Sequence, residues 1–200
     1  MNINQTILTQ ALQLLGGILD RDKLAKPIHF VVCSGSSLLM MGLVTRTTRD
    51  VDIIAYISTE HHTPGTLQYA SAMPDFLVNA AKRVAADLGL DENWLNTGPR
   101  NLLQFGLPEG FIDRLYSKAY GEKLTVSFID RLDQIHFKMY AAVDSGPGRH
   151  VNDLLALQPT LEEVELAAKW TLLQDTSPVF KEILTDMLKA LHYESIIAKL

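Results

Sequence analysis

Two aspartates separated by a single residue, Asp50 and Asp52, are the side chains of this sequence best placed for chemistry. The segment Val51–Ile57 is predicted to be a strand, and successive side chains of a strand point to opposite faces. Both carboxylates therefore project to one side, while Val51 and Ile53 turn toward the core. Oxygen ligands of this kind suit Mg²⁺ or Mn²⁺, which is held by one or two carboxylates, waters and nucleotide phosphates. The pair is predicted to be a metal site for phosphoryl transfer.

A second polar element lies upstream, in a predicted tight turn at residues 34–37 (Ser-Gly-Ser-Ser) between a buried strand and a short apolar helix. Free backbone N–H groups and the helix dipole at such a turn favour an anion such as a triphosphate. Glycine at Gly35 lets the backbone approach the ligand closely. The segment between Ser36 and Asp50 has room for one short helix and a return loop, so we expect both elements at one sheet edge.

The order of these motifs resembles the polymerase-β-like nucleotidyltransferase superfamily, in which a Gly-Ser turn, a short helix and an Asp-x-Asp strand follow one another. The matching segments are 34–38 and 46–53. More narrowly, the chain resembles bacterial nucleotidyltransferase-like proteins grouped with AbiEii-type toxins and with domain of unknown function 6036. The resemblance covers most of residues 5–160. Supporting similarity lies in Asn93-Trp94-Leu95-Asn96, Leu107-Pro108-Glu109-Gly110-Phe111, Lys138, Arg149 and Asp153-Leu154.

The resemblance implies that Asp50 and Asp52 bind the divalent metal and that Lys138 completes the catalytic set by neutralising phosphate charge. It also implies that Gly35 and Ser36 hold the nucleotide phosphates and that Arg149 and Asp153 lie near the site. Ser37 at the same turn, and Arg46 and Arg49 beside the acids, complete the predicted nucleotide-binding residues. Two departures stand out. The superfamily often adds a third carboxylate from a later strand, but residues 124–128 contain no acid, and Ser34 stands where relatives often carry a glycine.

The leading hypothesis is a metal-dependent nucleotidyltransferase that uses a nucleoside triphosphate and modifies a hydroxyl of RNA or of a protein. The resemblance suggests a toxin–antitoxin or phage-defence component with a cognate antitoxin as partner. The alternative is a catalytically inactive nucleotidyltransferase fold that acts as a nucleotide- or partner-binding module. A third alternative is a structural protein whose polar turn binds nothing.

Simpler interpretations of the same residues stay open. Asp50 and Asp52 would also fit solvated strand-edge acids paired with Arg46 or Arg49. Ser36 or Ser37 would also fit a helix cap. Lys138 would also fit a surface lysine that lays its aliphatic stem on apolar neighbours. Two further pairs of residues are predicted to lack a role in chemistry: loop histidines at His61-His62, and packing tryptophans at Trp94 and Trp170.

Composition bounds the class of protein. The chain has 200 residues, of which 47% are hydrophobic and 20% charged, and its net charge is -5. This length supports one ordinary core, and the negative charge argues against general electrostatic capture of nucleic acid or anionic membrane. No apolar run is long enough to span a membrane and no signal core is evident, so we expect a cytoplasmic protein. The lone cysteine, Cys33, is expected to be a small buried strand residue.

The surrounding pattern predicts an α/β (α+β) fold with a small mixed β-sheet core in residues 1–129 and a helical C-terminal region in 130–200 packed on that core. The first helix, Asn4–Leu19, is expected to break near Gly16-Gly17. Further elements are predicted as a strand at Ile28–Cys33, a helix at Asp75–Leu88, and a hairpin at Tyr116–Ile129 that turns at Gly121-Glu122. Capping residues predict helix starts at Asp130, Thr160 with Glu163, and Ser177 before Pro178, with a break at Gly146-Pro147-Gly148.

Overall fold

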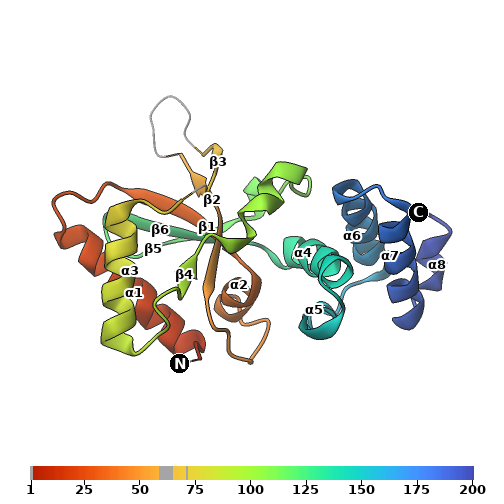
Figure 1. Ribbon diagram of the computed structural model, residues 1–200, viewed down its shortest axis with the longest axis horizontal. Coiled ribbons are helices and arrows are strands. Elements are labelled where there is room, and N and C mark those ends of the chain that lie inside the picture. Colours follow the sequence, from red (N-terminus) through yellow and green to blue (C-terminus); the bar gives the residue numbers. More distant parts are fainter. Residues whose placement is uncertain (1, 59–64, 71) are drawn as a thin grey trace. The chain divides into compact units, whose positions relative to one another are not determined.

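The computed structural model describes residues 2–58, 65–70 and 72–200 (Figure 1). The predicted histidine loop at His61-His62 lies outside these residues. The predicted fold class is confirmed, because a mixed sheet is flanked by helices and the C-terminal region is helical. The chain divides into two compact units. The first contains residues 1–104 and 112–129, and the second contains residues 105–111 and 130–200.

The first unit is built on a six-stranded sheet, counted over the described residues. Its strands are β1 (Ile28–Cys33), β2 (Val51–Ile57), β3 (Leu67–Tyr69), β4 (Leu95–Asn96), β5 (Tyr116–Ala119) and β6 (Leu124–Phe128). The order is β3-β2-β1-β6-β5, and β4 pairs with β2 beside this path. Strand β1 is antiparallel to β2 and parallel to β6, while β5 and β6 form the predicted antiparallel hairpin.

Two helices, α1 (Gln5–Arg21) and α3 (Asp75–Leu88), lie side by side against one face of this sheet (Figure 1). Their apolar faces share a core with strand residues such as Phe30 and Val32 of β1. Side chains alternate along a strand, so the residues between them point to the opposite face of the sheet. The core therefore fixes which side chains of β1 and β2 are left for chemistry.

The predicted break in the first helix is wrong, because α1 continues through Gly16 and Gly17 to Arg21. A Cβ atom on Gly16 would lie 1.5 Å from the backbone oxygen of Tyr120. The glycine thus lets the helix contact the β5–β6 hairpin closely, and it does not end the helix. The contact is reinforced by Asp20, which accepts hydrogen bonds from the backbone N–H groups at the hairpin turn.

The turn predicted at residues 34–37 is the first turn of a helix, α2 (Ser34–Met40), which begins directly at the end of β1. The segment between α3 and the β5–β6 hairpin contains regular secondary structure. It contains β4 and two 3₁₀ helices, η1 (Gly98–Phe105) and η2 (Ile112–Arg114). None of these three short elements was predicted, since two to eight residues carry too few periods to show a pattern.

The second unit is helical. Its helices are α4 (Arg131–Asp144), α5 (Gly148–Ala156), α6 (Leu161–Gln174), α7 (Pro178–Ala190) and α8 (Glu194–Ile197). The predicted caps are confirmed: Asp130 accepts from Leu132 N, Thr160 forms a capping box with Glu163, and Ser177 accepts from Phe180 N.

Both tryptophans are packing residues, as predicted. Trp170 lies among aromatic rings, with Phe137 at a centroid distance of 5.6 Å and Tyr140 at 6.2 Å. Trp94 in the first unit is fully buried, and its indole nitrogen donates to Ala81 O at 2.9 Å. Within the described residues, no helix is both long and apolar enough to cross a membrane.

Candidate functional site

The predicted acids lie where β1, α2 and β2 meet. The last residue of β1, Cys33, pairs with Asp52 of β2, and α2 starts at the next residue, Ser34. The N-terminus of α2 and the Asp52 position therefore share one end of the sheet. Strand β2 has neighbours on both sides, β1 on one and β3 and β4 on the other, so the strand-edge interpretation of the acids is wrong.

The two carboxylates are half-buried and are each held by a neighbouring polar side chain. Since Val51 and Ile53 belong to the core, Asp50 and Asp52 project from the opposite face. Thr48 Oγ1 donates to Asp50 Oδ1 at 3.4 Å, and Asn96 Nδ2 donates to Asp52 Oδ1 at 3.1 Å. The amide comes from β4, whose register places Asn96 directly opposite Asp52. Each acid thus has a positioning partner.

Gly35 links the helix start to this acidic segment. A Cβ atom at Gly35 would lie 2.7 Å from Thr48 Oγ1 and 2.9 Å from Thr48 Cβ. The absence of a side chain at this position lets residue 48, which holds Asp50, pack against the first turn of α2. The Arg46 side chain also approaches this point, because its Nη1 atom lies 3.6 Å from where a Cβ atom on Gly35 would be. Glycine at this position therefore leaves room for the Thr48 side chain against the first turn of α2.

The Ser36 and Ser37 hydroxyls at the start of α2 both donate hydrogen bonds to backbone carbonyls. Ser36 Oγ donates to Cys33 O at 2.9 Å, and Ser37 Oγ donates to Ile129 O at 3.2 Å. Both serines are buried, and neither caps the helix, since the N-cap position is Cys33 and its side chain makes no capping bond. Any anion at this turn would therefore meet backbone N–H groups in place of these two hydroxyls.

Ser34 adopts a backbone φ of 60°, which is the left-handed region that favours glycine. A glycine at this position would adopt the same backbone angle without the steric cost of a Cβ atom. We expect Ser34→Gly to raise the free energy of unfolding by about 0.5–1 kcal/mol, because relief of strain exceeds the added entropy of the unfolded chain. Urea denaturation measures this change. Ser34→Ala, which keeps the Cβ atom, is the control, and an equal gain in both variants would contradict the explanation.

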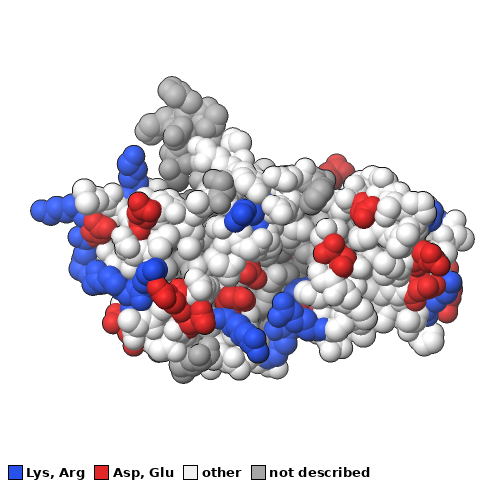
Figure 2. All heavy atoms as spheres, viewed as in Figure 1, with Lys and Arg blue, Asp and Glu red and all other residues white. Residues whose placement is uncertain are grey.

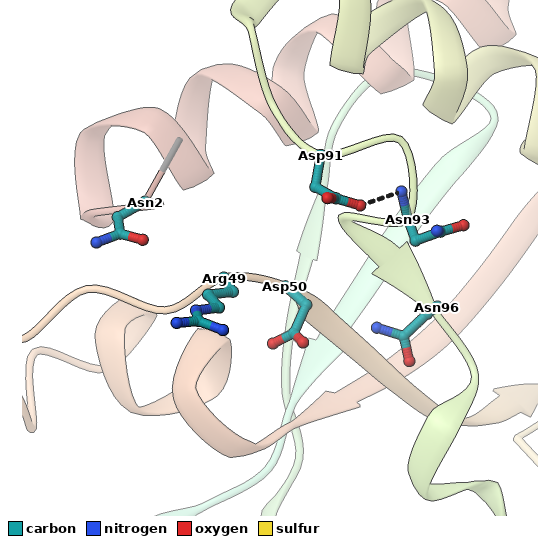
Figure 3. A pocket seen from close by; sticks show the side chains of 6 residues that line it. All are labelled: Asn2, Arg49, Asp50, Asp91, Asn93 and Asn96. Carbon is teal, nitrogen blue, oxygen red and sulfur yellow. Dashed lines mark hydrogen bonds between the residues drawn. The ribbon is translucent and has the colours of Figure 1, made fainter.

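A polar cavity of about 620 Å³ opens beside Asp50 (Figure 3). Its lining residues are Asn2, Arg49, Asp50, Asp91, Asn93 and Asn96. Figure 3 shows the Asp50 carboxylate between the side chains of Arg49 and Asn96, while Asp91 accepts a hydrogen bond from Asn93 N at 2.9 Å. The volume falls in the range of small-ligand sites, although the lining is more polar than usual. The sequence did not single out Asn2 or Asp91.

The donor atoms present suit a hard divalent cation. Carboxylate oxygens from Asp50 and Asp52 fit Mg²⁺ or Mn²⁺, which take their remaining ligands from water and phosphate. Over the described parts of the chain, no group of three or more His, Cys, Asp or Glu residues is arranged to hold a metal ion. Strand β6, which contains no acid, is separated from β2 by β1. On the opposite side of β2, the residue paired with Asp52 is Asn96 of β4.

Three further predicted site residues lie in the helical unit. Lys138 of α4 and Asp153 of α5 form an ion pair at 2.8 Å, and their side chains are 5% and 3% exposed. The interpretation of Lys138 as a surface lysine is therefore wrong. Arg149 is exposed in the first turn of α5. The remaining predicted residues, from Gly35 to Asp52, all belong to the first unit.

Charges of both signs are interspersed over the face of the described residues drawn in Figure 2. This distribution agrees with the modest net charge of -5. Comparisons of the chain with protein-family models, with curated proteins and with solved structures found no match.

Proposed function

We propose that this protein is a metal-dependent nucleotidyltransferase that moves a nucleotidyl group from a nucleoside triphosphate to a hydroxyl of an RNA or protein acceptor. The observation that carries the proposal is the pairing of Cys33 with Asp52, which brings the start of α2 and the carboxylates to one end of the sheet. The polar cavity beside Asp50 supports it, since its volume is sufficient for a small ligand.

Each residue has a proposed role. Asp50 and Asp52 would hold Mg²⁺ or Mn²⁺, which when bound supplies charge stabilisation for the phosphates. Thr48 and Asn96 fix the orientation of these carboxylates through the hydrogen bonds described above. Arg49, which lines the cavity, would contact a phosphate as a charged donor. The first-turn N–H groups of α2 would add weaker donors.

Within the helical unit, Lys138 and Asp153 form a buried ion pair, so the charge of the lysine is already neutralised there. By resemblance we further propose a toxin–antitoxin or phage-defence role, with a cognate antitoxin as partner.

A second candidate function is a nucleotide-binding or partner-binding module without turnover. One observation favours it: the Asn96 amide occupies an oxygen of Asp52 at the position opposite that acid. Asp52 is thus satisfied by a protein partner without a metal, and the described residues include no group of three or more His, Cys, Asp or Glu that could hold one. Both candidate functions predict nucleotide binding, but only the transferase predicts transfer of a nucleotidyl group to an acceptor.

Incubation of the pure protein with each α-labelled nucleoside triphosphate tests the proposal. The mixtures contain Mg²⁺ or Mn²⁺ together with total RNA or protein extract, and we expect label on one acceptor class. Nucleotide binding without transfer under every condition would favour the module. Absence of both binding and transfer would contradict the metal and nucleotide site itself.

A further inference from the structure

Strand β5 (Tyr116–Ala119) ends the sheet, and all of its residues are exposed. Its inner side pairs with β6, with Ser117 opposite Ser127 and Lys118 opposite Val126. Ser117 Oγ lies 2.7 Å from Ser127 Oγ, which in turn lies 2.7 Å from His29 Nε2. The strand is thus fixed to the sheet through its side chains as well as its backbone, and it presents a rigid edge.

The outer side of β5 presents unpaired backbone groups. Tyr120 N donates to Leu124 O at 2.8 Å, which makes this a hydrogen-bonded pair of the antiparallel ladder. Such pairs alternate along the strands, so Tyr116 and Lys118 also bond inward, while the N–H and C=O groups of Ser117 and Ala119 point outward. No described strand lies beyond them. A strand can therefore be added to this edge.

A groove of about 490 Å³ runs along the same strand. It is lined by Gln5, Thr6, Thr9, Gln10, Met40, Tyr116 and Lys118. These side chains include no acid, and no ion pair of Lys118 is formed within the described part of the chain. The ammonium group of Lys118 lies 5.3 Å from the centroid of the Tyr120 ring. The groove is thus a mostly polar surface that carries one positive charge and no acid.

A second copy of this chain is a poor occupant. The symmetric antiparallel registers open to the outward groups of Ser117 and Ala119 place Lys118, Tyr116 or Tyr120 of the other copy opposite Lys118, so a second copy supplies no acid there. Like charges in that position destabilise a strand pair. An opposite charge across from Lys118 would stabilise the strand pair. The lysine therefore favours a different chain that has an acid at that position.

We propose that β5 docks an extended segment of a partner protein, which adds to the sheet as an antiparallel strand and places an acidic side chain opposite Lys118. The backbone groups of Ser117 and Ala119 supply the hydrogen bonds, as in other cases of strand addition. The residue two positions from the acid would contact Tyr116, which is 54% exposed. A β-branched or aromatic residue suits that contact. This inference does not depend on the proposed transferase activity.

Two blocked synthetic peptides of alternating valine and threonine test the proposal, one with a central glutamate and one with a central lysine. In heteronuclear NMR titrations of the whole protein, the glutamate peptide should shift the amides of Ser117 and Ala119. Its Kd should be about two- to fivefold lower than that of the lysine peptide. Lys118→Glu should reverse this order, because the charge opposite the central residue is inverted.

Ala119→Pro provides a second test, since proline removes one outward N–H while the ladder to β6 stays intact. We expect loss of peptide binding with an unchanged circular dichroism spectrum, and Ala119→Val is the control that keeps the donor. Equal affinity for both peptides, or shifts confined to other residues, would overturn the proposal. A dimer in light scattering that Ala119→Pro abolishes would assign the edge to a second copy and would overturn it as well.

Discussion

Gly16→Ala is expected to lower the free energy of unfolding of the first unit by about 3 kcal/mol or more. The new Cβ atom would lie 1.5 Å from the backbone oxygen of Tyr120 and 2.6 Å from its carbonyl carbon. Both are backbone atoms of the hairpin, so no change of rotamer relieves the overlap. Relief requires that α1 moves away from β5 and β6, which opens the core that buries Leu12, Leu15 and Leu19.

Gly17→Ala is the matched control for this prediction, one residue further along the same helix. The nearest atom to a Cβ at Gly17 is Arg21 Nη1 at 3.7 Å, at the end of a flexible side chain. We expect this substitution to raise the free energy of unfolding by about 0.5–1 kcal/mol, because alanine has a better helix propensity than glycine. Urea denaturation of the two variants measures both changes, and similar values for both would refute the close contact of helix and hairpin.

Asp50→Asn and Asp52→Asn are each expected to lower the rate of nucleotidyl transfer by on the order of 10³-fold. The change keeps the shape of each side chain and removes the charge that would bind the metal. The two acids are proposed to hold one ion, so the double variant should fall little further than either single variant. Stability measured by denaturation should change by less than about 1 kcal/mol, because both groups are only half-buried.

Asn96→Ala is the matched control for these variants, since it removes the positioning hydrogen bond and keeps both acids. Loss of such a supporting partner typically costs about 10–100-fold. A fall of the same size as that of Asp52→Asn would assign Asn96 to the reaction itself. An unchanged rate in the aspartate variants would show that the carboxylates take no part in transfer.

Regular periodicity and capping chemistry explain what the sequence could predict. The bounds of β1, β2 and α3 agree with their predicted ranges, because β1 and β2 are short apolar runs flanked by polar residues and α3 repeats apolar residues at helical spacing. In the helical unit, the capping residues before α4, α6 and α7 placed the helix starts correctly. These are local signals, readable without knowledge of tertiary packing.

The errors arise where tertiary contacts determine the conformation. The glycines at 16 and 17 predict a helix break, but Gly16 instead leaves room for the backbone of Tyr120, which is far away in the sequence. Strand β4 has only two residues and exists through its pairing with β2. The pattern around Lys138 fits a surface helix, whereas Asp153 of the next helix pairs with it in a buried position.

The same limit applies to the candidate site. The Asp-x-Asp spacing and the Gly-Ser motif are local, so the sequence could bring them forward as a pair. The cavity residues Asn2 and Asp91 come from segments distant from Asp50 in the chain, and no spacing connects them. Likewise, the positions of the Ser36 and Ser37 hydroxyls depend on the carbonyls that α2 meets, including Ile129 O from the end of the hairpin.

The most direct test of the central claim is electron paramagnetic resonance of Mn²⁺ with a non-hydrolysable nucleoside triphosphate and the intact protein. We predict that wild-type protein binds Mn²⁺ together with the nucleotide at one site, and that Asp50→Asn and Asp52→Asn each weaken this Mn²⁺ binding by more than about tenfold. Equal binding of Mn²⁺ and nucleotide by the wild-type protein and both variants would contradict the assignment of these carboxylates to a metal–nucleotide site.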